Sequence, residues 1–295
     1  MNGYSSHTLK LVNSEGKQFW SKWHFKTDSG IKNLSDEEAC KIAGTDPNYA
    51  TRDLFNHIDK GGVASWTVCV QIIPFEDAEK YKFNIFDVTK VVSHKDYPLI
   101  KLGKLVLDRN PTNYFAEIEQ AAFSPSHMVP GIEPSPDRML QGRLFSYPDT
   151  HRHRLGTNYL HLPINRPFKT KVANHQRDGF MVTTDNGGAA PNYEPNSFGG
   201  PVEHPSGKIA PFSVSGTVDR VRVRVSKPED DFYQAGVLFR EVMTEKDRKN
   251  LISNMAGHMR NASVEIQKRC VALFAKCDPE YGRRLAEALG IHSKI

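Results

Sequence analysis

The chain has 295 residues, of which 38% are hydrophobic and 25% are charged. These proportions are typical of a folded globular protein with a sizeable core. No apolar run approaches the roughly 18 residues needed to cross a membrane, so we expect no membrane segment. The formal net charge of +5 comes from lysines and arginines spread along the chain rather than gathered in one tract. This distribution argues against a nucleic-acid partner.

The cysteines and the first residues bear on the cellular compartment. Cys40, Cys69, Cys270 and Cys277 form no Cys-x-x-Cys pair and no regular framework, so we interpret them as reduced packing residues. The segment from Met1 to Thr8 lacks the basic and apolar regions of a secretory signal. Both observations predict an intracellular protein.

The first part of the chain predicts β-structure. Residues 6–28 alternate between apolar and polar side chains around a turn at Asn13-Ser-Glu-Gly16, which predicts a hairpin with its apolar face buried and Lys10, Lys22, His24 and Lys26 on the other face. Further strands are predicted at 66–73, 102–107 and 114–123. A capping box at Ser35 and Glu38 and a helix start at Asp46-Pro47 predict two short helices between these strands.

The rest of the chain predicts helices and one long irregular segment. Ser135-Pro136 opens a helix that we expect to run to about Leu155, with a kink at Pro148. Residues 160–225 are rich in Pro, Asn and Gly, and such a segment is unusual unless it wraps around other elements or another subunit. Near the C-terminus, helix starts are predicted at Thr244, Ser263 and Asp278-Pro279, with a stop at Gly290.

One face of the helix at 135–155 gathers side chains of distinctive chemistry. At intervals of four, four, four and three residues, this face carries Met139, Arg143, Tyr147, His151 and Arg154. Such a face fits beneath a porphyrin, with the Tyr147 oxygen on the iron, Arg143 donating to that oxygen and Arg154 reaching a propionate. The same spacing also fits an ordinary polar helix face. Spacing alone leaves both alternatives open.

A separate metal site at His151 and His153 is the third interpretation of this segment. Two histidines two residues apart can bind one metal ion from a strand. On a helix their side chains diverge, and no third ligand follows at a suitable spacing. We therefore expect no zinc or copper site here.

The complete residue string distinguishes these alternatives. From Arg143 to Gly156 the chain reads Arg-Leu-Phe-Ser-Tyr-Pro-Asp-Thr-His-Arg-His-Arg-Leu-Gly, which resembles the proximal haem-ligand signature of the catalase family almost residue for residue. Other stretches similar to this family are 1–4, 28–34, 94–99, 103–111 and 113–117. The resemblance covers essentially the whole chain. It implies a haem b cofactor and the conversion of hydrogen peroxide to water and oxygen.

The resemblance implies a role for each matching residue. Tyr147 is expected to be the axial iron ligand and Arg143 its hydrogen-bond partner, with His7 and Asp137 supporting that arginine. The other matches to the proximal haem pocket are Phe123, Met139, His151 and, at a propionate contact, Arg154. Without the resemblance, Phe123 and Met139 would be ordinary core residues.

A second cofactor site, for NADPH, is also implied by the resemblance. The matching positions are Asn2, Tyr4, Lys26, Val91, His94 and Gln234. The chain departs from NADPH-binding members at Val92, where they carry tryptophan, and at Leu238, where they usually carry phenylalanine. Both departures remove aromatic surface and put this site in doubt. The alternative is that Lys26 and His94 are ordinary surface residues.

The resemblance also implies an α+β fold. We expect the second half of an antiparallel β-barrel with helical insertions at 1–134, the proximal haem helix and a wrapping arm at 135–225, and a C-terminal α-helical domain at 226–295. The arm is expected to help assemble a homotetramer. The final Ser293-Lys294-Ile295 differs in one residue from the peroxisomal Ser-Lys-Leu address. We therefore predict a peroxisomal location, with the cytoplasm as the alternative.

Catalase chemistry also needs a distal histidine and asparagine to orient peroxide and move its proton. The family carries them in its N-terminal part, ahead of the point at which the similarity begins here. We therefore expect an incomplete sequence whose 295 residues are inactive alone. The alternatives are a non-catalytic truncated product that binds haem or only joins full-length subunits, and a relative with other peroxide chemistry, such as a fatty-acid hydroperoxide enzyme.

Overall fold

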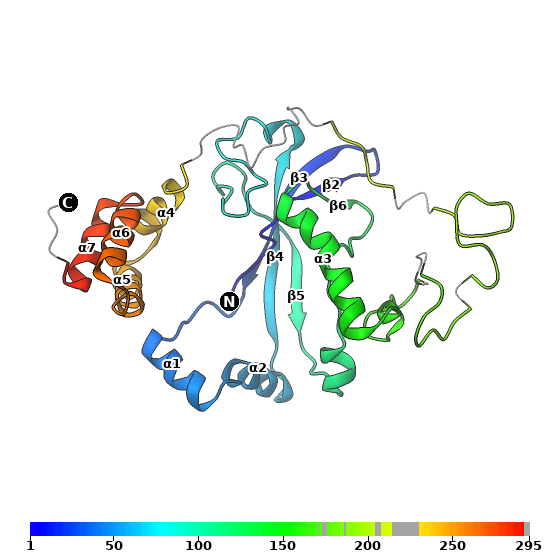
Figure 1. Cartoon of the computed structure of the whole chain (residues 1–295), viewed down its shortest axis with the longest axis horizontal. Helices are drawn as coiled ribbons and strands as arrows, with labels where there is room; N and C mark the ends of the chain where they lie inside the picture. The colour runs from blue at the N-terminus through cyan, green and yellow to red at the C-terminus, as the bar shows by residue number, and fades with distance from the viewer. Residues whose placement is uncertain (171, 173–175, 186, 204–207, 214–229, 292–295) are drawn as a thin grey trace. The chain divides into compact units, whose positions relative to one another are not determined.

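The computed structural model describes residues 1–170, 172, 176–185, 187–203, 208–213 and 230–291. The chain divides into two compact units, one formed by residues 1–31 and 52–215 and the other by residues 32–51 and 216–295. Figure 1 shows the long strands of the first unit and the packed C-terminal helices of the second. Within the described ranges, no helix has the length and hydropathy needed to cross a membrane.

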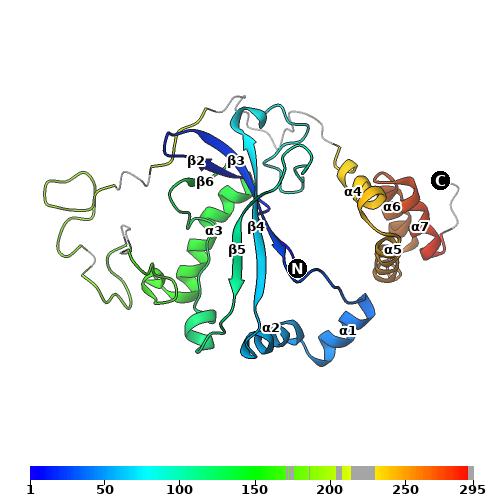
Figure 2. The ribbon, with the colours of Figure 1, turned by 180° about the vertical axis from the view of Figure 1, so that it is seen from behind.

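An antiparallel sheet of six strands forms the centre of the first unit, and Figures 1 and 2 show it from both sides. The strand order is β5 (Ile100–Leu107), β4 (Ala64–Pro74), β3 (Gln18–Thr27), β2 (Leu9–Val12) and β6 (Ile132–Pro134), and β1 (Gly3–Tyr4) also pairs with β3. The hairpin of β2 and β3 and the strands expected at 66–73 and 102–107 are confirmed. The sheet is open, because no described strand joins β5 to β6.

The polar face of the β2–β3 hairpin is buried, contrary to the prediction. Lys10, Lys22 and His24 are 0%, 8% and 6% exposed, and Trp20, which shares this face, is 2% exposed. This face is buried because a segment distant in sequence covers it: Phe75 and Phe86, in the loop after β4, pack against Trp20. A hydrophobic core therefore forms on the side that the alternation assigned to solvent.

The strand predicted at 114–123 is wrong. Residues Phe115–Glu119 form one helical turn instead. The Asn113 side-chain oxygen accepts a backbone N–H of this turn at 2.9 Å, and the Glu117 carboxylate reaches back to the Asn113 N–H at 2.8 Å. These bonds satisfy the free amide groups of a helix start, so local capping outweighs the strand preference of the apolar side chains.

The other predicted helices are confirmed. The capping box at Ser35 starts α1 (Asp36–Thr45), and α2 (Tyr49–Asp59) follows. The long helix α3 (Arg138–Leu155) contains Pro148, and its N-cap is Asp137 rather than the predicted Ser135. The remaining helices are α4 (Tyr233–Val237), η5 (Leu238–Val242), α5 (Glu245–Met259), α6 (Val264–Ala275) and α7 (Pro279–Leu289). Thr244, Ser263 and Asp278 are the N-cap residues of α5, α6 and α7, and Gly290 is the C-cap of α7, as predicted, although the Ser263 side chain makes no capping hydrogen bond.

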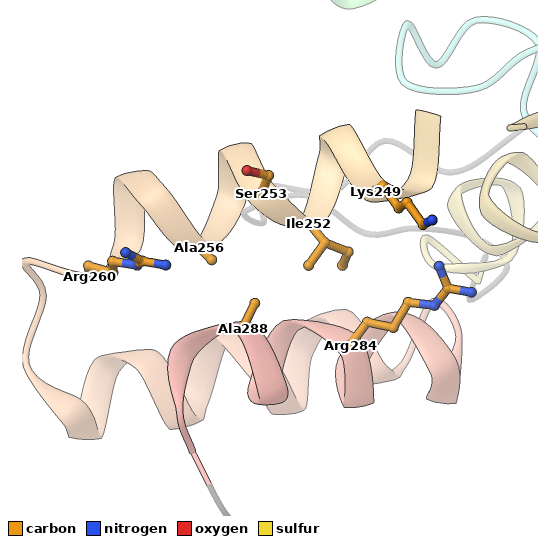
Figure 3. Close-up of a pocket in the computed structure, with 7 residues that line it drawn as sticks. All are labelled: Lys249, Ile252, Ser253, Ala256, Arg260, Arg284 and Ala288. Atoms are coloured by element: carbon orange, nitrogen blue, oxygen red, sulfur yellow. The ribbon is translucent and has the colours of Figure 1, made fainter. Parts of the chain in front are cut away.

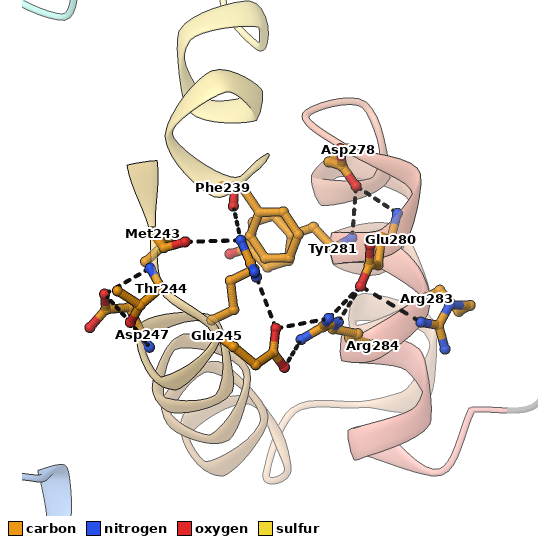
Figure 4. Close-up of polar contacts among 11 residues, drawn as sticks. Phe239, Met243, Thr244, Glu245, Asp247, Asp278, Glu280, Tyr281, Arg283 and Arg284 are labelled. Atoms are coloured by element: carbon orange, nitrogen blue, oxygen red, sulfur yellow. Dashed lines mark hydrogen bonds and ion pairs between the residues drawn. The ribbon is translucent and has the colours of Figure 1, made fainter. Parts of the chain in front are cut away.

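The C-terminal helices pack around Phe239, Leu285 and the ring of Tyr281, which stacks on Phe239 at 4.9 Å. A polar network ties α5 to α7, as Figure 4 shows: Arg284 donates to Glu245 at 2.7 Å and also bonds to Glu280. Hydrogen bonds from Arg284 and Arg248 lower the pKa of Glu245 to about 2. This helical unit therefore has its own apolar core and its own ion-pair network.

In the described part of 160–225, the only regular element is a single turn at Tyr159–His161 that overlaps its start. This agrees with the predicted irregular segment. Its later part is fastened to the sheet, because Lys10 donates to the Ala210 carbonyl at 2.6 Å and Phe212 packs against Trp20. The wrapping of this segment around another subunit remains a prediction.

Candidate functional site

Four side chains form a continuous chain of hydrogen bonds that runs from the N-cap of α3, through His7 between β1 and β2, to the middle of α3. The Asp137 carboxylate lies 2.6 Å from His7 Nδ1, and His7 Nε2 lies 2.8 Å from Arg143 Nη1. Arg143 Nη2 then donates to the Tyr147 hydroxyl at 2.9 Å. His7 and Arg143 are 136 residues apart in sequence. The fold therefore brings together the predicted ligand Tyr147, its predicted hydrogen-bond partner and the two residues predicted to support that partner.

Donor and acceptor chemistry fixes the direction of this chain. A guanidinium group only donates, so His7 Nε2 and the Tyr147 oxygen are both acceptors. His7 consequently carries its ring proton on Nδ1 and donates it to Asp137. Asp137 and His7 are 2% and 4% exposed, so the charge of Arg143 is balanced by a buried carboxylate. The arrangement presents a positive N–H donor to the Tyr147 oxygen.

Asp137 also starts α3. While its Oδ2 accepts from His7, its Oδ1 accepts the backbone N–H groups of Met139 and Leu140 at 2.9 and 3.1 Å. This is an N-cap bond pattern, which stabilises the first turn of a helix. One carboxylate therefore sets both the start of the helix and the orientation of the histidine behind Arg143.

The remaining predicted haem-pocket residues lie around the same helix face. His151 donates from Nε2 to the Phe123 carbonyl at 2.8 Å, and this bond holds Phe123 beside α3. The Phe123 and Met139 side chains are 87% and 57% exposed, so neither is the core residue that the alternative interpretation required. Arg154 donates to the carbonyls of residues 119 and 121. Its contact with a propionate stays a prediction.

The donor set fits a haem group. A tyrosine oxygen is the axial ligand of haem iron in catalases, and here the Tyr147 oxygen accepts a hydrogen bond from Arg143. Exposed Phe123 and Met139 offer apolar surface that a flat macrocycle would cover. Tyr147 is half-buried, and its hydroxyl accepts a hydrogen bond from Arg143. The residues that would hold haem are therefore in place around one face of α3.

Four of the six residues predicted for NADPH also lie close together. Asn2 and Lys26 both donate to the Tyr4 hydroxyl, at 3.2 and 3.3 Å, and these bonds lower the pKa of Tyr4. The His24 ring lies between the rings of Tyr4 and His94, with centroids 5.5 and 5.3 Å away. We call these five residues the Tyr4 cluster. Val91 lies three residues from His94, whereas Gln234 belongs to the second unit and is described apart from them.

Comparison with known proteins decides the family. The family model described as Catalase matches residues 1–200, and the one described as Catalase-related immune-responsive matches residues 225–289. The chain belongs to the catalase family.

Individual catalases are similar along almost the whole chain. It is 58% identical to Catalase-A of Dictyostelium discoideum over 294 residues, which cover 99% of this chain and 59% of that protein. It is 54% identical to the peroxisomal catalase of Toxoplasma gondii over 294 residues, covering 99% of this chain and 58% of the relative. Among solved structures, a fungal catalase superposes with a TM-score of 0.90 at 44% identity, covering 100% of this chain and 59% of the other.

The chain therefore spans only part of these catalases. The matches cover between 54% and 59% of the length of the curated relatives. Catalase A of Saccharomyces cerevisiae gives the same result, with a TM-score of 0.89 and 60% of its chain covered.

A groove in the second unit is lined by none of the residues predicted for the catalase site. It occupies about 340 Å³ between α5 and α7, as Figure 3 shows. Ile252, Ala256 and Ala288 form its apolar floor, and Lys249 and Arg284 converge at one end. Arg284 is already bonded to Glu245 and Glu280. The groove is therefore a surface feature of the helical unit and not part of the proximal site.

Sequence reasoning missed two residues of the Tyr4 cluster and its support, His24 and Gln71. Alternation on β3 assigned His24 to a solvent face, although it is 6% exposed. Gln71 is 1% exposed and accepts from His24 Nε2 at 2.8 Å. A polar residue within the apolar run of β4 was the available signal, because a buried amide requires partners.

Proposed function

We propose that this chain forms the proximal haem side of a catalase that converts hydrogen peroxide to water and oxygen. The hydrogen-bond chain from Asp137 through His7 and Arg143 to Tyr147 carries this proposal. Tyr147 would bind the iron of haem b through its oxygen. The bound haem would supply the redox-active iron for peroxide chemistry.

The protein's own residues would prepare the ligand for that role. Arg143 would hold the Tyr147 oxygen with a charge-assisted hydrogen bond and stabilise negative charge on it. His7 and Asp137 would keep the guanidinium in this orientation. Met139, Phe123 and His151 would line the haem face, and Arg154 would bind a propionate after exchanging a backbone carbonyl for the carboxylate.

Substituting Tyr147→Phe tests the ligand assignment. Because the variant lacks the oxygen, we expect ferric haem to bind at least tenfold more weakly, which corresponds to about 1.4 kcal/mol, and the tyrosinate features to disappear from the haem spectrum. Haem titration followed by absorbance measures both effects without relying on turnover. Tyr114→Phe removes an exposed hydroxyl outside the site and serves as the control. A Tyr147→Phe protein with the haem affinity and spectrum of the parent would show that another residue is the ligand.

We further propose that the Tyr4 cluster contributes to an NADPH site together with Val91. The part of Gln234, which belongs to the second unit, stays a prediction from the resemblance. Lys26 supplies a cation for phosphate, and Val91, which is 65% exposed, supplies apolar surface. The departure at Val92 has a structural counterpart, because this side chain is 2% exposed and packs in the core. The departure at Leu238 is different, since this side chain is half exposed and remains available.

The proposed assembly is a homotetramer to which residues 160–225 contribute. The described part of this segment exposes large apolar side chains, among them Phe168, Phe180 and Phe198. Another subunit would remove this surface from water. All eight residues of β5 are also exposed, and further strands of the family's barrel would cover them. Sedimentation that shows only monomers would contradict the tetramer.

We also propose a peroxisomal location. The support is the C-terminal tripeptide Ser293-Lys294-Ile295, which lies outside the described residues, and the Toxoplasma gondii relative is named a peroxisomal catalase. Fusing the last ten residues to a fluorescent protein would test this address. Diffuse cytoplasmic fluorescence would contradict it.

A further inference from the structure

Gln71 connects the two histidines of the Tyr4 cluster. It lies on β4 and is 1% exposed. Its Oε1 lies 2.8 Å from His24 Nε2, and its Nε2 lies 2.7 Å from the Tyr97 carbonyl and 3.3 Å from the Val92 carbonyl. These carbonyls stand on either side of His94 in the loop after β4. One buried amide therefore bonds to His24 directly and to the segment that carries His94.

The partners of Gln71 fix the orientation of its amide group. Carbonyl oxygens only accept hydrogen bonds, so the nitrogen end of the amide must face the loop. The oxygen end must then face His24, whose Nε2 has to donate. Burial lowers the pKa of His24, and this effect, together with the positive charges of Lys26 and Lys22, outweighs the hydrogen bond to Gln71, which acts in the opposite direction. A neutral His24 with its proton on Nε2 follows at neutral pH.

This tautomer leaves His24 Nδ1 as an unprotonated acceptor. Nδ1 is buried and has no hydrogen-bond partner within the described residues. Tyr4 and His94 both pack edge-on against the same ring. A buried acceptor without a partner is unfavourable, because it has lost its hydrogen bond to water. The protein therefore maintains an unfavourable group at the base of the Tyr4 cluster, and Gln71 determines which ring nitrogen it is.

We propose that Gln71 is a positioning residue for the nucleotide-binding surface at the Tyr4 cluster. It fixes the tautomer of His24 and holds the loop that carries His94. This inference rests on the proposed NADPH site. Gln71 does not itself reach the surface. It acts through His24 and through the carbonyls on either side of His94, so its loss would disturb the cluster without removing any residue that contacts the nucleotide.

The parent protein provides the first test. Nitrogen-15 NMR of histidine-labelled protein distinguishes protonated from unprotonated ring nitrogens, and the His24 signals can be assigned by their loss in His24→Gln. We expect His24 to show protonated Nε2 and unprotonated Nδ1 at neutral pH. A His24 with its proton on Nδ1 would overturn the proposal whether or not any variant folds.

Gln71→Met provides the second test, because methionine has a similar volume and lacks the amide. We expect the His24 signals to move toward a mixture of both tautomers and NADPH to bind about tenfold more weakly in a fluorescence titration. The control is Ser21→Ala, which removes another buried side-chain hydrogen bond from the same sheet, to the Leu9 carbonyl, and should change neither readout. Parent-like tautomer or parent-like NADPH affinity in Gln71→Met would overturn the proposal.

The two readouts separate this inference from the function on which it rests. If the parent binds no NADPH, the proposed NADPH site fails, and with it the role of Gln71 toward a nucleotide. The NMR measurement would then still decide whether Gln71 fixes the His24 tautomer. If the parent binds NADPH and Gln71→Met binds it with the same affinity, the NADPH site stands and the positioning role fails.

Discussion

At the scale of single residues, Asp137 joins the start of a helix to the support of a ligand. Its two oxygens have different partners, with Oδ1 on the first-turn amides of α3 and Oδ2 on His7 Nδ1. His7 Nε2 can accept from Arg143 because the ring proton stays on Nδ1, where Asp137 accepts a hydrogen bond from it. The direction of the whole chain to Tyr147 therefore depends on an acceptor at Asp137.

We expect Asp137→Asn and Asp137→Ala to separate these two roles. Asparagine keeps an oxygen for the cap but turns an N–H donor toward His7, which forces the His7 proton onto Nε2, against Arg143. Both variants should therefore bind haem more weakly than the parent. Only alanine also loses the cap, so its free energy of unfolding should be about 1 kcal/mol below that of the asparagine variant. Urea unfolding and haem titration measure the two effects.

The control for Asp137 is a cap with no connection to the site. Thr244→Ala removes the side-chain N-cap of α5 in the other unit. It should lower stability by a similar amount and leave haem affinity unchanged. If Asp137→Asn binds haem as tightly as the parent, the carboxylate is a cap and nothing more.

At the scale of elements, α6 and α7 approach so closely that a glycine is required between them. A Cβ added to Gly282 would lie 2.5 Å from the Ala275 Cβ and 2.9 Å from its Cα. Both positions lie in rigid helices, so the overlap cannot be relieved by rotating a side chain. Helix propensity favours alanine over glycine by about 1 kcal/mol. Packing at this contact acts in the opposite direction.

We expect Gly282→Ala to lower the free energy of unfolding of the helical unit by roughly 1–3 kcal/mol, the usual cost of overpacking. Gly257→Ala is the matched control, because Gly257 is an exposed position of α5 with nothing within 4 Å of an added Cβ. That substitution should stabilise the unit by up to about 1 kcal/mol. Urea unfolding of both variants checks the contrast, and equal effects would contradict the packing argument.

At the scale of the whole molecule, a buried lysine connects segments 200 residues apart. Lys10 Nζ lies 2.7 Å from the Glu133 carboxylate and 2.6 Å from the Ala210 carbonyl. Glu133 in turn accepts the Ala210 backbone N–H at 3.1 Å. The Lys10–Glu133 ion pair therefore binds both the backbone carbonyl and the backbone N–H of Ala210. Phe212, two residues further along, packs against Trp20.

We expect Lys10→Met to release this segment from the sheet. Removing one partner of a buried ion pair typically costs about 3–5 kcal/mol, because the other charge is left uncompensated. Urea unfolding should show the loss, and proteolysis within 208–213 should become faster. Lys17→Met, at the exposed end of the hairpin turn, controls for the loss of a lysine. If both variants are equally stable and equally resistant to protease, the ion pair does not fasten this segment.

Short-range patterns predicted much of the secondary structure. The hairpin of β2 and β3 and the helix starts at Thr244, Ser263 and Asp278 were predictable because alternation and capping act over a few residues. The strand predicted at 114–123 was wrong for an equally local reason, because the side chains of Asn113 and Glu117 cap a helical turn there. Tyr147 and Arg143 were found from their helical spacing together with the resemblance to catalases.

Long-range packing decided the rest. No local pattern places His7 beside Arg143, or Gln71 beside His24, because these contacts depend on which strands become neighbours and which loops cover them. The same is true of Lys10, which alternation assigned to solvent and the fold buries beneath Ala210 and Phe212. A buried charge is stable only with partners, and those partners are Glu133 on β6 and the Ala210 carbonyl, 200 residues along the chain.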